Sequence, residues 1–468
     1  MVCNDLLMEF SQLSQSLGAR LVSFGSESGF SSVNIDSRLV TEGSLFVALE
    51  GEVSDGHRFT EAAFKNGAAA ALVESKKCEQ FNLESVAEKY GKTLVIVEDS
   101  LKGLQEAART YLRKFPNLKK IGITGSSGKT TTKEITASVI GAEKCVIANP
   151  GNYNSEIGLP LAVFSVRSCH EIGVFEAGMN KRGEMAVLAS ILKPNIALIT
   201  CIGFAHIGCI GSIEGIAKEK KQIFSFFDEN CIALVPDESA FRDFLAEGVK
   251  GRVSFFGEKT LAQFGGAKSL GLDGYEILWN GEKIHFPLAG RHNLANALAS
   301  LAIACEIPVS DLAVKQGLES VQPLFGRGEI LRGRATVIRD CYNSNPESLA
   351  AAVEFCDNPD IDGRRIYVIG EMLELGEESQ KSHEEAGRLL SGSKAALVLL
   401  YGEEAAAAAS AMKGGPVRFF HTCDMGELSR LLKSNLLDGD IVLLKGSRGC
   451  ALEKLTEVCG VSPSAEVC

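Results

Sequence analysis

The chain has 468 residues, of which 45% are hydrophobic and 23% are charged, so it is long enough for about two to four globular domains. Its net charge of -11 and pI of about 5.4 argue against a protein that binds nucleic acid through the phosphate backbone. The 14 cysteines include no Cys-x-x-Cys pair, which argues against a zinc ribbon or a thioredoxin-type site and favours reduced thiols in a cytoplasmic protein.

Two segments bear on targeting. The N-terminal sequence MVCNDLLMEF carries Asp5 and Glu9 and has no basic region, so we expect no secretory signal. Residues 194–211 contain no Asp, Glu, Lys or Arg, but they include Asn195, His206 and several glycines. We interpret them as a buried strand that leads into a functional loop, and we expect no membrane insertion.

Strand-like apolar segments alternate with helical patterns along most of the chain. The predicted strands are residues 94–98, 120–124, 172–176, 197–201, 232–236, 336–340, 365–370, 396–401 and 440–445, and the predicted helices are residues 100–115, 129–140, 212–227 and 293–305. Between residues 255 and 286 the strands become short, and the Asn280-Gly281 pair predicts a hairpin. Alternating strands and helices favour parallel sheets covered by helices.

We therefore predict an α/β protein with three domains. A small α/β N-terminal domain (1–98) is followed by a central P-loop mononucleotide-binding domain with a parallel sheet (99–325) and by a Rossmann-like C-terminal domain (326–468).

The tract KKIGITGSSGKTTTKEI predicts a phosphate-binding loop. A strand leads into Gly125, two serines, Gly128, Lys129 and Thr130, and a helix follows. Glycines allow backbone amides to turn toward a phosphate, and a helix N-terminus adds positive potential. Lys129 can reach the terminal phosphates, and the hydroxyl of Thr130 can bind Mg²⁺. Because Ile123 replaces the first glycine of the general pattern, the motif is the compact Gly-x-x-Gly-Lys-Thr form.

Several other polar residues have both a structural and a functional interpretation. Glu176 ends a strand of the parallel sheet, where side chains face the ligand crevice. His206 in an apolar segment would ordinarily be a hydrogen-bonded core residue, and Lys220 in a run of charges would ordinarily be solvated. Asn293 is a candidate helix N-cap, although Asn293 and Asn296 also share one helical face.

Together these motifs resemble the Mur ligase family, the ATP-dependent enzymes that build the peptidoglycan stem peptide, from near residue 33 to near residue 455. The resemblance implies ATP and two Mg²⁺ ions as cofactors. It implies a catalytic set of Lys129, Glu176, His206 and Lys220, and metal ligands at Thr130, Glu176, His206 and Lys220, with Lys220 carbamylated. Two positions depart from the family, since Cys201 replaces the usual Asn and Gln222 the usual Glu.

The resemblance also implies nucleotide and substrate contacts. The residues expected to bind ATP are Gly125, Ser126, Ser127, Gly128, Lys129, Thr130, Thr131, His292, Asn293, Asn296, Arg327 and Asp340. Those expected to bind the UDP-muramoyl substrate or the acceptor are Ser37, Arg38, Asn152, Asn154, Tyr342, Asn343 and Asn345.

The tract DCYNSNPES (340–348) distinguishes branches of the family. Members that act one step earlier typically carry Asp-Tyr-Ala-His-x-Pro here, whereas Asp-x-Tyr-Asn-x-Asn-Pro favours the branch that adds D-alanyl-D-alanine to UDP-N-acetylmuramoyl-tripeptide through an acyl phosphate. The third residue of the peptide, diaminopimelate or lysine, stays open. The alternatives are an earlier Mur ligase, folylpolyglutamate synthase, or a P-loop nucleotide sensor that ligates nothing. We expect a cytoplasmic monomer that binds no nucleic acid.

Overall fold

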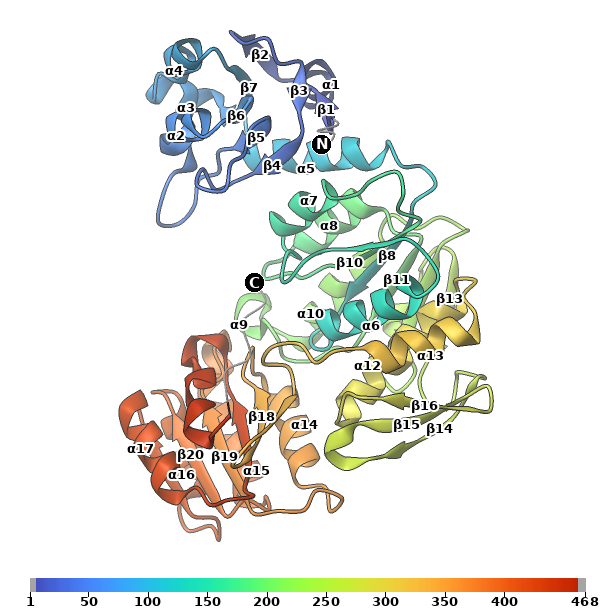
Figure 1. Cartoon of the computed structure of the whole chain (residues 1–468), viewed down its shortest axis with the longest axis vertical. Coiled ribbons are helices and arrows are strands. Elements are labelled where there is room, and N and C mark those ends of the chain that lie inside the picture. Colours follow the sequence, from blue (N-terminus) through green and yellow to red (C-terminus); the bar gives the residue numbers. More distant parts are fainter. Residues whose placement is uncertain (1–5, 462–468) are drawn as a thin grey trace. The chain divides into compact units, whose positions relative to one another are not determined.

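The computed structural model describes residues 6–461 and has the predicted α/β composition (Figure 1). The chain forms two compact units, and the strands of the central sheet are divided between them. The first unit comprises Met1–Gly122, Cys145–Met179 and Ala186–Pro194, and the second comprises Ile123–Lys144, Asn180–Met185 and Asn195–Cys468. The predicted domain boundaries near residues 98 and 325 stay predictions.

The N-terminal part of the first unit contains a five-stranded sheet with the order β2-β7-β6-β5-β4. Its strands are β2 (Arg20–Ser23), β4 (Ser32–Asn34), β5 (Ser44–Val47), β6 (Ala70–Glu74) and β7 (Thr93–Val97), and only β2 runs antiparallel to its neighbour. The accompanying helices are α1 (Phe10–Leu17), α2 (Thr60–Lys65), α3 (Ser75–Gln80), α4 (Leu83–Tyr90) and α5 (Ser100–Leu112), and β1 (Met8–Glu9) pairs with β3 (Gly29–Phe30). Alternating apolar residues between Val40 and Ile96 form the core of this sheet.

The central sheet has the order β13-β12-β11-β8-β10-β9. Its strands are β8 (Lys119–Thr124), β9 (Val146–Ala148), β10 (Ile172–Glu176), β11 (Ile196–Ile199), β12 (Ile232–Pro236) and β13 (Arg252–Phe256). The associated helices are α6 (Lys129–Gly141), α7 (Gly158–Val163), α8 (Glu184–Leu192), α9 (Ile207–Ile210), α10 (Ile213–Lys221), α11 (Arg242–Ala246), α12 (Arg291–Cys305) and α13 (Asp311–Ser320). The predicted helix 212–227 is shorter than expected, because α10 ends at Lys221 and a short 3-10 turn (Gln222–Phe224) follows.

A three-stranded antiparallel sheet, β14-β15-β16, follows in the second unit. It comprises β14 (Phe264–Ser269), β15 (Tyr275–Trp279) and β16 (Glu282–Phe286). Asn280 and Gly281 join the last two strands with φ angles of 46° and 84°. Positive φ at both central positions is the requirement of a two-residue hairpin turn, so the predicted hairpin is confirmed.

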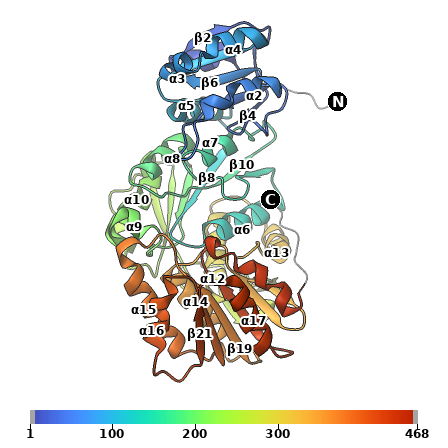
Figure 2. The same cartoon turned by 90° about the vertical axis from the view of Figure 1, so that its left-hand side faces the viewer.

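The C-terminal sheet has the order β17-β18-β22-β19-β20-β21, and only β17 is antiparallel. Its strands are β17 (Glu329–Arg332), β18 (Thr336–Asp340), β19 (Arg365–Gly370), β20 (Leu397–Tyr401), β21 (Phe419–Thr422) and β22 (Ile441–Lys445). Helix α17 (Met425–Asn435) packs on one face, and α14 (Pro346–Cys356), α15 (Ser379–Ser391) and α16 (Ala405–Met412) lie on the other (Figure 2). This layered arrangement is the predicted Rossmann-like one.

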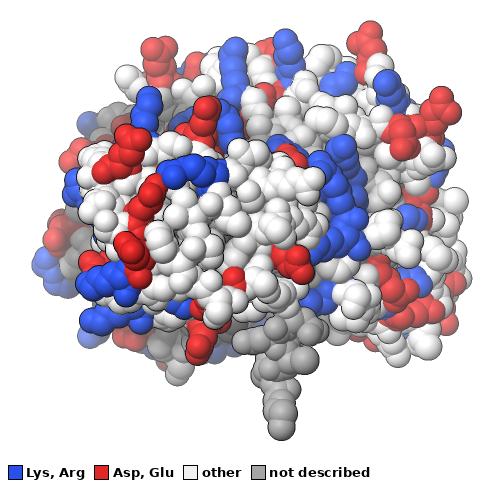
Figure 3. Space-filling view, turned by 90° about the horizontal axis from the view of Figure 1, so that it is seen from above, with Lys and Arg blue, Asp and Glu red and all other residues white. Residues whose placement is uncertain are grey.

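Among residues 6–461, no helix is long and apolar enough to cross a membrane. On the face drawn in Figure 3, acidic and basic side chains are interspersed among uncharged areas. That face therefore offers no extended basic surface, within its described residues, to a polyanion.

Candidate active site

The phosphate loop lies between the end of β8 and the start of α6. Gly128 has a φ of 79° and caps α6, and the first intrahelical bond runs from the Thr132 amide to the Gly128 carbonyl at 2.8 Å. The amides of Thr130 and Thr131 precede that bond, so they are available to a phosphate. A Cβ atom on Gly128 would lie 2.2 Å from Oδ1 of Asn296, and one on Gly125 would lie 1.8 Å from Oγ1 of Thr200. Both positions therefore require glycine, because the side chains of Asn296 and Thr200 leave no room for a Cβ atom.

The loop is held by the segment that follows β11. The Ser126 amide donates to the Cys201 carbonyl at 2.9 Å, and the Ser126 hydroxyl donates to the Gly203 carbonyl at 3.0 Å. The Ser127 amide donates to Sγ of Cys201 at 3.4 Å. Cys201, one of the two residues expected to depart from the family pattern, thus lies against the phosphate loop and fixes Ser127.

Lys220 and Lys129 lie at the same loop carbonyl. Lys220 is fully buried on α10, and its Nζ donates to the Gly125 carbonyl at 2.9 Å, as does Nζ of Lys129 at 2.9 Å. Burial and the charge of Lys129 lower the pKa of Lys220 well below its usual range. A neutral amine is the form that reacts with CO₂, so the environment of Lys220 fits the expected carbamate better than a solvated charge.

His206 is the N-cap of α9 with a φ of 66°, and its Nδ1 lies 3.3 Å from Oε2 of Glu374. Burial, with the positive charges of Lys129 and Lys220, lowers the pKa of His206 to about 4. The imidazole is therefore neutral near pH 7, which is the state that can bind a metal ion.

Two residues that the sequence did not single out hold the His206 loop. Oε1 of Glu347, on α14, accepts a hydrogen bond from the Phe204 amide at 2.8 Å. Glu374, whose φ is 67°, contacts His206 itself. The loop that carries Glu374 is held in turn by the Leu373 amide, which donates to Oγ of Ser447 at 2.9 Å. The stretch GEMLELGEES suggested that this region matters, but a single glutamate in it carries no separate signal.

Glu176 belongs to the first unit, where it ends β10 as predicted. Its side chain is 1% exposed, Oε1 accepts Nδ2 of Asn154 at 2.6 Å, and Oε2 has no hydrogen-bond partner among the residues described. The amide of Glu176 donates to Oδ1 of Asn149 at 2.8 Å. A buried carboxylate oxygen left unpaired is costly, so this atom fits a cation ligand. Asn152 is exposed in the turn before Asn154.

Three of the residues expected to bind ATP, His292, Asn293 and Asn296, lie at the start of α12. Asn293 is not the N-cap, because the helix starts at Arg291 after Gly290 and the Asn293 side chain donates to the Ala289 carbonyl at 2.7 Å. Asn296 donates to Oδ1 of Asn293 at 3.4 Å and accepts the Thr132 hydroxyl at 3.3 Å. Both amides therefore brace α12 against the phosphate-loop helix. Nδ1 of His292 is buried and has no partner among residues 6–461.

The C-terminal residues cluster at the ends of β18 and β22. Oδ2 of Asp340 lies 3.2 Å from Nζ of the buried Lys445, which also donates to the Asn343 carbonyl at 2.6 Å. The Arg327 guanidinium lies 4.0 Å from the ring centroid of Tyr342. These contacts bring Asp340, Asn343 and Lys445 together at the carboxyl ends of β18 and β22, where side chains of a parallel sheet can face a ligand.

Asn345 links this region to the phosphate loop. It caps α14 through a reciprocal capping box with Ser348, and its Nδ2 donates to Oγ of Ser127 at 3.3 Å. Asn345 therefore has two contacts, because it caps α14 and also binds the phosphate loop.

The predicted UDP residues lie in the first unit. Ser37 is buried and its carbonyl accepts Nδ2 of Asn66 at 2.8 Å, whereas Arg38 is exposed and paired with Asp36 at 2.6 Å. The neighbouring His57 is fully buried, with Nδ1 2.7 Å from Oδ1 of Asp55 and Nε2 accepting the Glu74 amide at 3.0 Å. His57 therefore supports the sheet, and Arg38 is the side chain open to a ligand.

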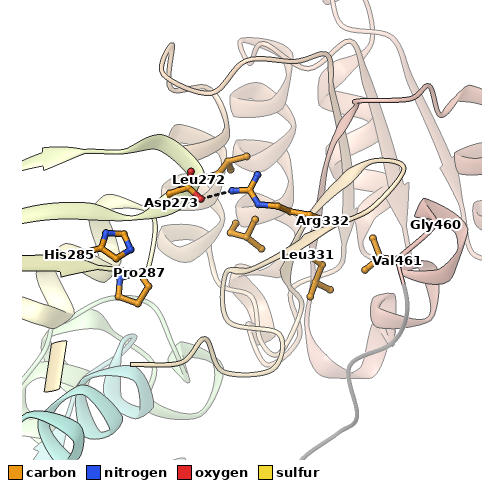
Figure 4. Close-up of a pocket in the computed structure, with 9 residues that line it drawn as sticks. Leu272, Asp273, His285, Pro287, Leu331, Arg332, Gly460 and Val461 are labelled. Atoms are coloured by element: carbon orange, nitrogen blue, oxygen red, sulfur yellow. Dashed lines mark hydrogen bonds and ion pairs between the residues drawn. The ribbon is translucent and has the colours of Figure 1, made fainter. Parts of the chain in front are cut away.

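A cavity of about 610 Å³ lies elsewhere, between β16 and β17 (Figure 4). Its lining includes His285, Leu331 and Val461, together with the ion pair between Asp273 and Arg332 at 2.5 Å. None of the predicted site residues lines this cavity, so it is separate from the candidate active site.

Comparison with known proteins extends over almost the whole chain. Models described as Mur ligase family catalytic domain, Mur ligase middle domain and Mur ligase glutamate ligase domain match residues 30–112, 123–304 and 326–448. The chain is 40% identical over 453 residues to the UDP-N-acetylmuramoyl-tripeptide–D-alanyl-D-alanine ligase of Treponema pallidum, covering 96% of this chain and 98% of that relative. The enzyme of that name from Bacillus subtilis is 32% identical, with 91% and 92% covered.

Solved structures agree with these relatives. A crystal structure of MurF from Acinetobacter baumannii superposes with a TM-score of 0.86 at 27% identity and covers 96% of this chain and 98% of that one. MurF ligase from Thermotoga maritima in complex with ADP gives a TM-score of 0.76 at 28% identity and covers 92% and 97%.

Proposed function

Because this chain belongs to the Mur ligase family, we propose that it is the ATP-dependent ligase that joins D-alanyl-D-alanine to UDP-N-acetylmuramoyl-tripeptide in peptidoglycan precursor synthesis. The observation that carries the proposal is similarity to ligases of that activity over 96% of the chain. The tract 340–348 lies within that similarity and carries the pattern of the same branch.

The reaction forms one amide bond and consumes one ATP. The terminal carboxylate of the tripeptide attacks the γ-phosphorus of ATP, and the bond between that phosphorus and the β,γ-bridging oxygen breaks. ADP is released, and the tripeptide now carries an acyl phosphate. The amine of D-alanyl-D-alanine then attacks the acyl carbon, phosphate leaves, and the amine proton passes to solvent. Lys129 and the amides at the start of α6 stabilise the charge that develops on the transferred phosphoryl group.

We assign Mg²⁺ to Thr130, Glu176, His206 and a carbamylated Lys220. The unpaired Oε2 of Glu176, the neutral imidazole of His206 and the depressed pKa of Lys220 each fit this assignment. The bound ions would neutralise phosphate charge during transfer. For carbamylation, the Lys220 nitrogen attacks the carbon of CO₂ and releases a proton, which leaves an anionic carbamate.

We assign the remaining contacts by position. His292, Asn293, Asn296, Arg327 and Asp340 belong to the ATP site, and Ser37, Arg38, Asn152, Asn154, Tyr342, Asn343 and Asn345 belong to the sites of the two other substrates. The proposal includes a monomer in the cytoplasm, which sedimentation of the purified protein and cell fractionation would test.

The decisive experiment supplies ATP, Mg²⁺, D-alanyl-D-alanine and a UDP-N-acetylmuramoyl-tripeptide that carries either diaminopimelate or lysine. Mass spectrometry should show a pentapeptide product, with ADP formed in equal amount and only when both other substrates are present. In a parallel reaction that offers a single amino acid in place of D-alanyl-D-alanine, ligation of that amino acid would instead indicate an earlier Mur ligase or a folylpolyglutamate synthase. ATP binding without any product would indicate a nucleotide sensor.

A further inference from the structure

Two exposed cysteines and a histidine converge at the amino ends of β9 and β10. Cys145 directly precedes β9, and Cys169 and His170 lie just before β10. The two strands are parallel neighbours with Val146 opposite Ile172, and the Glu171 amide donates to the Cys145 carbonyl at 2.8 Å. The backbone of two separate chain segments therefore fixes these three side chains in one place.

The ligand atoms of Cys145, Cys169 and His170 lie within 4.8 Å of one another, and no other group of three such residues does so among residues 6–461. Tetrahedral zinc has Zn–S bonds of about 2.3 Å and Zn–N bonds of about 2.0–2.1 Å, which place its ligand atoms roughly 3.5–3.8 Å apart. Small side-chain rotations therefore suffice. We propose that Cys145, Cys169 and His170 form a binding site for a thiophilic divalent metal ion such as Zn²⁺, with water as the fourth ligand.

The protonation of the three groups determines how the ion binds. Nδ1 of His170 accepts the Arg167 amide at 2.9 Å, so the neutral ring carries its proton on Nε2. An ion on Nδ1 replaces the Arg167 amide as partner of that atom, whereas an ion on Nε2 requires the ring proton to move to Nδ1, which also breaks the bond with the Arg167 amide. Cys145 and Cys169 bind as thiolates and release two protons to the buffer. Two thiolates balance the charge of the ion, so the cysteines supply most of the affinity.

Binding of the ion needs no oxidant, because the metal displaces the thiol protons directly.

The distance of the proposed metal site from Glu176 predicts how a bound ion affects stability and ligation. Glu176 lies at the carboxyl end of β10, about 13 Å of extended strand away from Ile172. The ion would tie the start of β9 to the turn before β10, so it should stabilise the fold and leave the ligation rate unchanged. It is also independent of the Mg²⁺ assignment above.

The test uses the full-length protein, reduced with a phosphine and stripped of metal. Zn²⁺ is titrated in competition with a chromogenic chelator, and Co²⁺ is titrated separately. We expect the double variant Cys145→Ser/Cys169→Ser to bind one equivalent of Zn²⁺ less than the wild type and to lose the thiolate-to-cobalt charge-transfer band. His170→Ala should weaken binding about tenfold or more. Cys423→Ser, which alters an exposed cysteine in the turn after β21, should behave as the wild type.

A second measurement separates binding from folding. Zn²⁺ should raise the melting temperature of the wild type with concentration and leave that of the double variant unchanged, while the two proteins have the same circular dichroism without metal. Equal Zn²⁺ stoichiometry in both proteins would overturn the proposal. So would a Cys145–Cys169 disulfide as the sole product, with no Zn²⁺ bound by the reduced pair.

Discussion

Glu176 has one carboxylate oxygen bonded to Asn154 and a second, buried oxygen with no partner among the described residues. The variant Glu176→Gln keeps the acceptor for Asn154 and removes the negative charge. We expect turnover to fall about a hundredfold or more, with a higher Mg²⁺ requirement and little change in melting temperature. Initial rates across a Mg²⁺ series would measure this. Glu98→Gln, at an exposed residue that directly follows β7, is the matched control. An unchanged Mg²⁺ requirement would remove Glu176 from the metal site.

Lys220 and Lys218 lie on the same helix, but only Lys220 is buried. We expect Lys220→Arg to abolish most activity, because arginine cannot form a carbamate. Carbon-13 NMR in labelled bicarbonate should show a carbamate signal in the wild type and in Lys218→Arg, and none in Lys220→Arg. Since the neutral amine is reactive and burial with Lys129 lowers its pKa, the signal should persist near neutral pH and disappear as the pH falls below that lowered pKa. A signal in Lys220→Arg would place the carbamate elsewhere.

At the scale of single residues, the sequence indicates candidate site residues by their chemical type, but it does not show which residues they contact in the fold. Lys220 looks like one member of a solvated charge run, and only the fold shows its contact with the Gly125 carbonyl. Asn293 looks like a helix cap, yet the helix starts two residues earlier. Glu347 and Glu374 carried no signal, because their function depends on a loop more than a hundred residues away in sequence.

At the scale of elements, the turn between β8 and α6 depends on two glycines that pack against other segments. Gly128→Ala would introduce a Cβ 2.2 Å from Oδ1 of Asn296 at a φ of 79°. Gly414 has a nearly equal φ of 81°, but nothing lies within 4 Å of the added atom. We expect Gly128→Ala to weaken ADP binding at least about tenfold and Gly414→Ala to leave it unchanged, as measured by calorimetry. Equal effects would mean that backbone conformation, and not the contact with α12, sets the requirement for glycine.

Helix α14 positions the His206 loop through Glu347. Glu347→Ala removes the acceptor of the Phe204 amide, whereas Glu347→Gln retains an oxygen there. We expect the alanine variant to lower kcat about tenfold and the glutamine variant to restore most of it, because the Phe204 amide would otherwise lose its acceptor and the His206 loop its attachment to α14. Steady-state kinetics would check this, with Glu354→Ala on the exposed side of α14 as control. Equal kcat values for the alanine variant and the wild type would assign Glu347 a purely local role.

Element prediction succeeded where periodicity and turn chemistry agreed. Ile172–Glu176, Ile232–Pro236, Thr336–Asp340 and Arg365–Gly370 have the predicted bounds, because continuous apolar residues in short segments favour buried parallel strands. Helix ends were less predictable. The chain between residues 213 and 227 tightens into a 3-10 turn at Gln222, and the end of a helix depends on tertiary packing as much as on the local sequence.

At the scale of the whole molecule, the strand order of the C-terminal sheet places β22 between β18 and β19, a crossover that no local pattern encodes. Among the residues that the structure describes, the buried core on one face of this sheet lies between Ala335 and Val461, with Leu331 packed against it. A segment that supplies its own core can fold alone. We therefore expect the fragment 326–468 to unfold cooperatively in urea, as followed by circular dichroism.

The same fragment lacks the phosphate loop, so it should bind no ADP and release no phosphate with the full set of substrates. Adding residues 1–325 as a separate chain should restore little activity, because Asn345 and Glu347 contact Ser127 and Phe204 through single hydrogen bonds that cannot offset the entropy of association. A non-cooperative transition in the fragment, with dye-accessible apolar surface, would show that the boundary near residue 325 cuts through a folding unit. Cooperative unfolding with no nucleotide binding would instead support a third domain that folds by itself and acts only when joined to the rest of the chain.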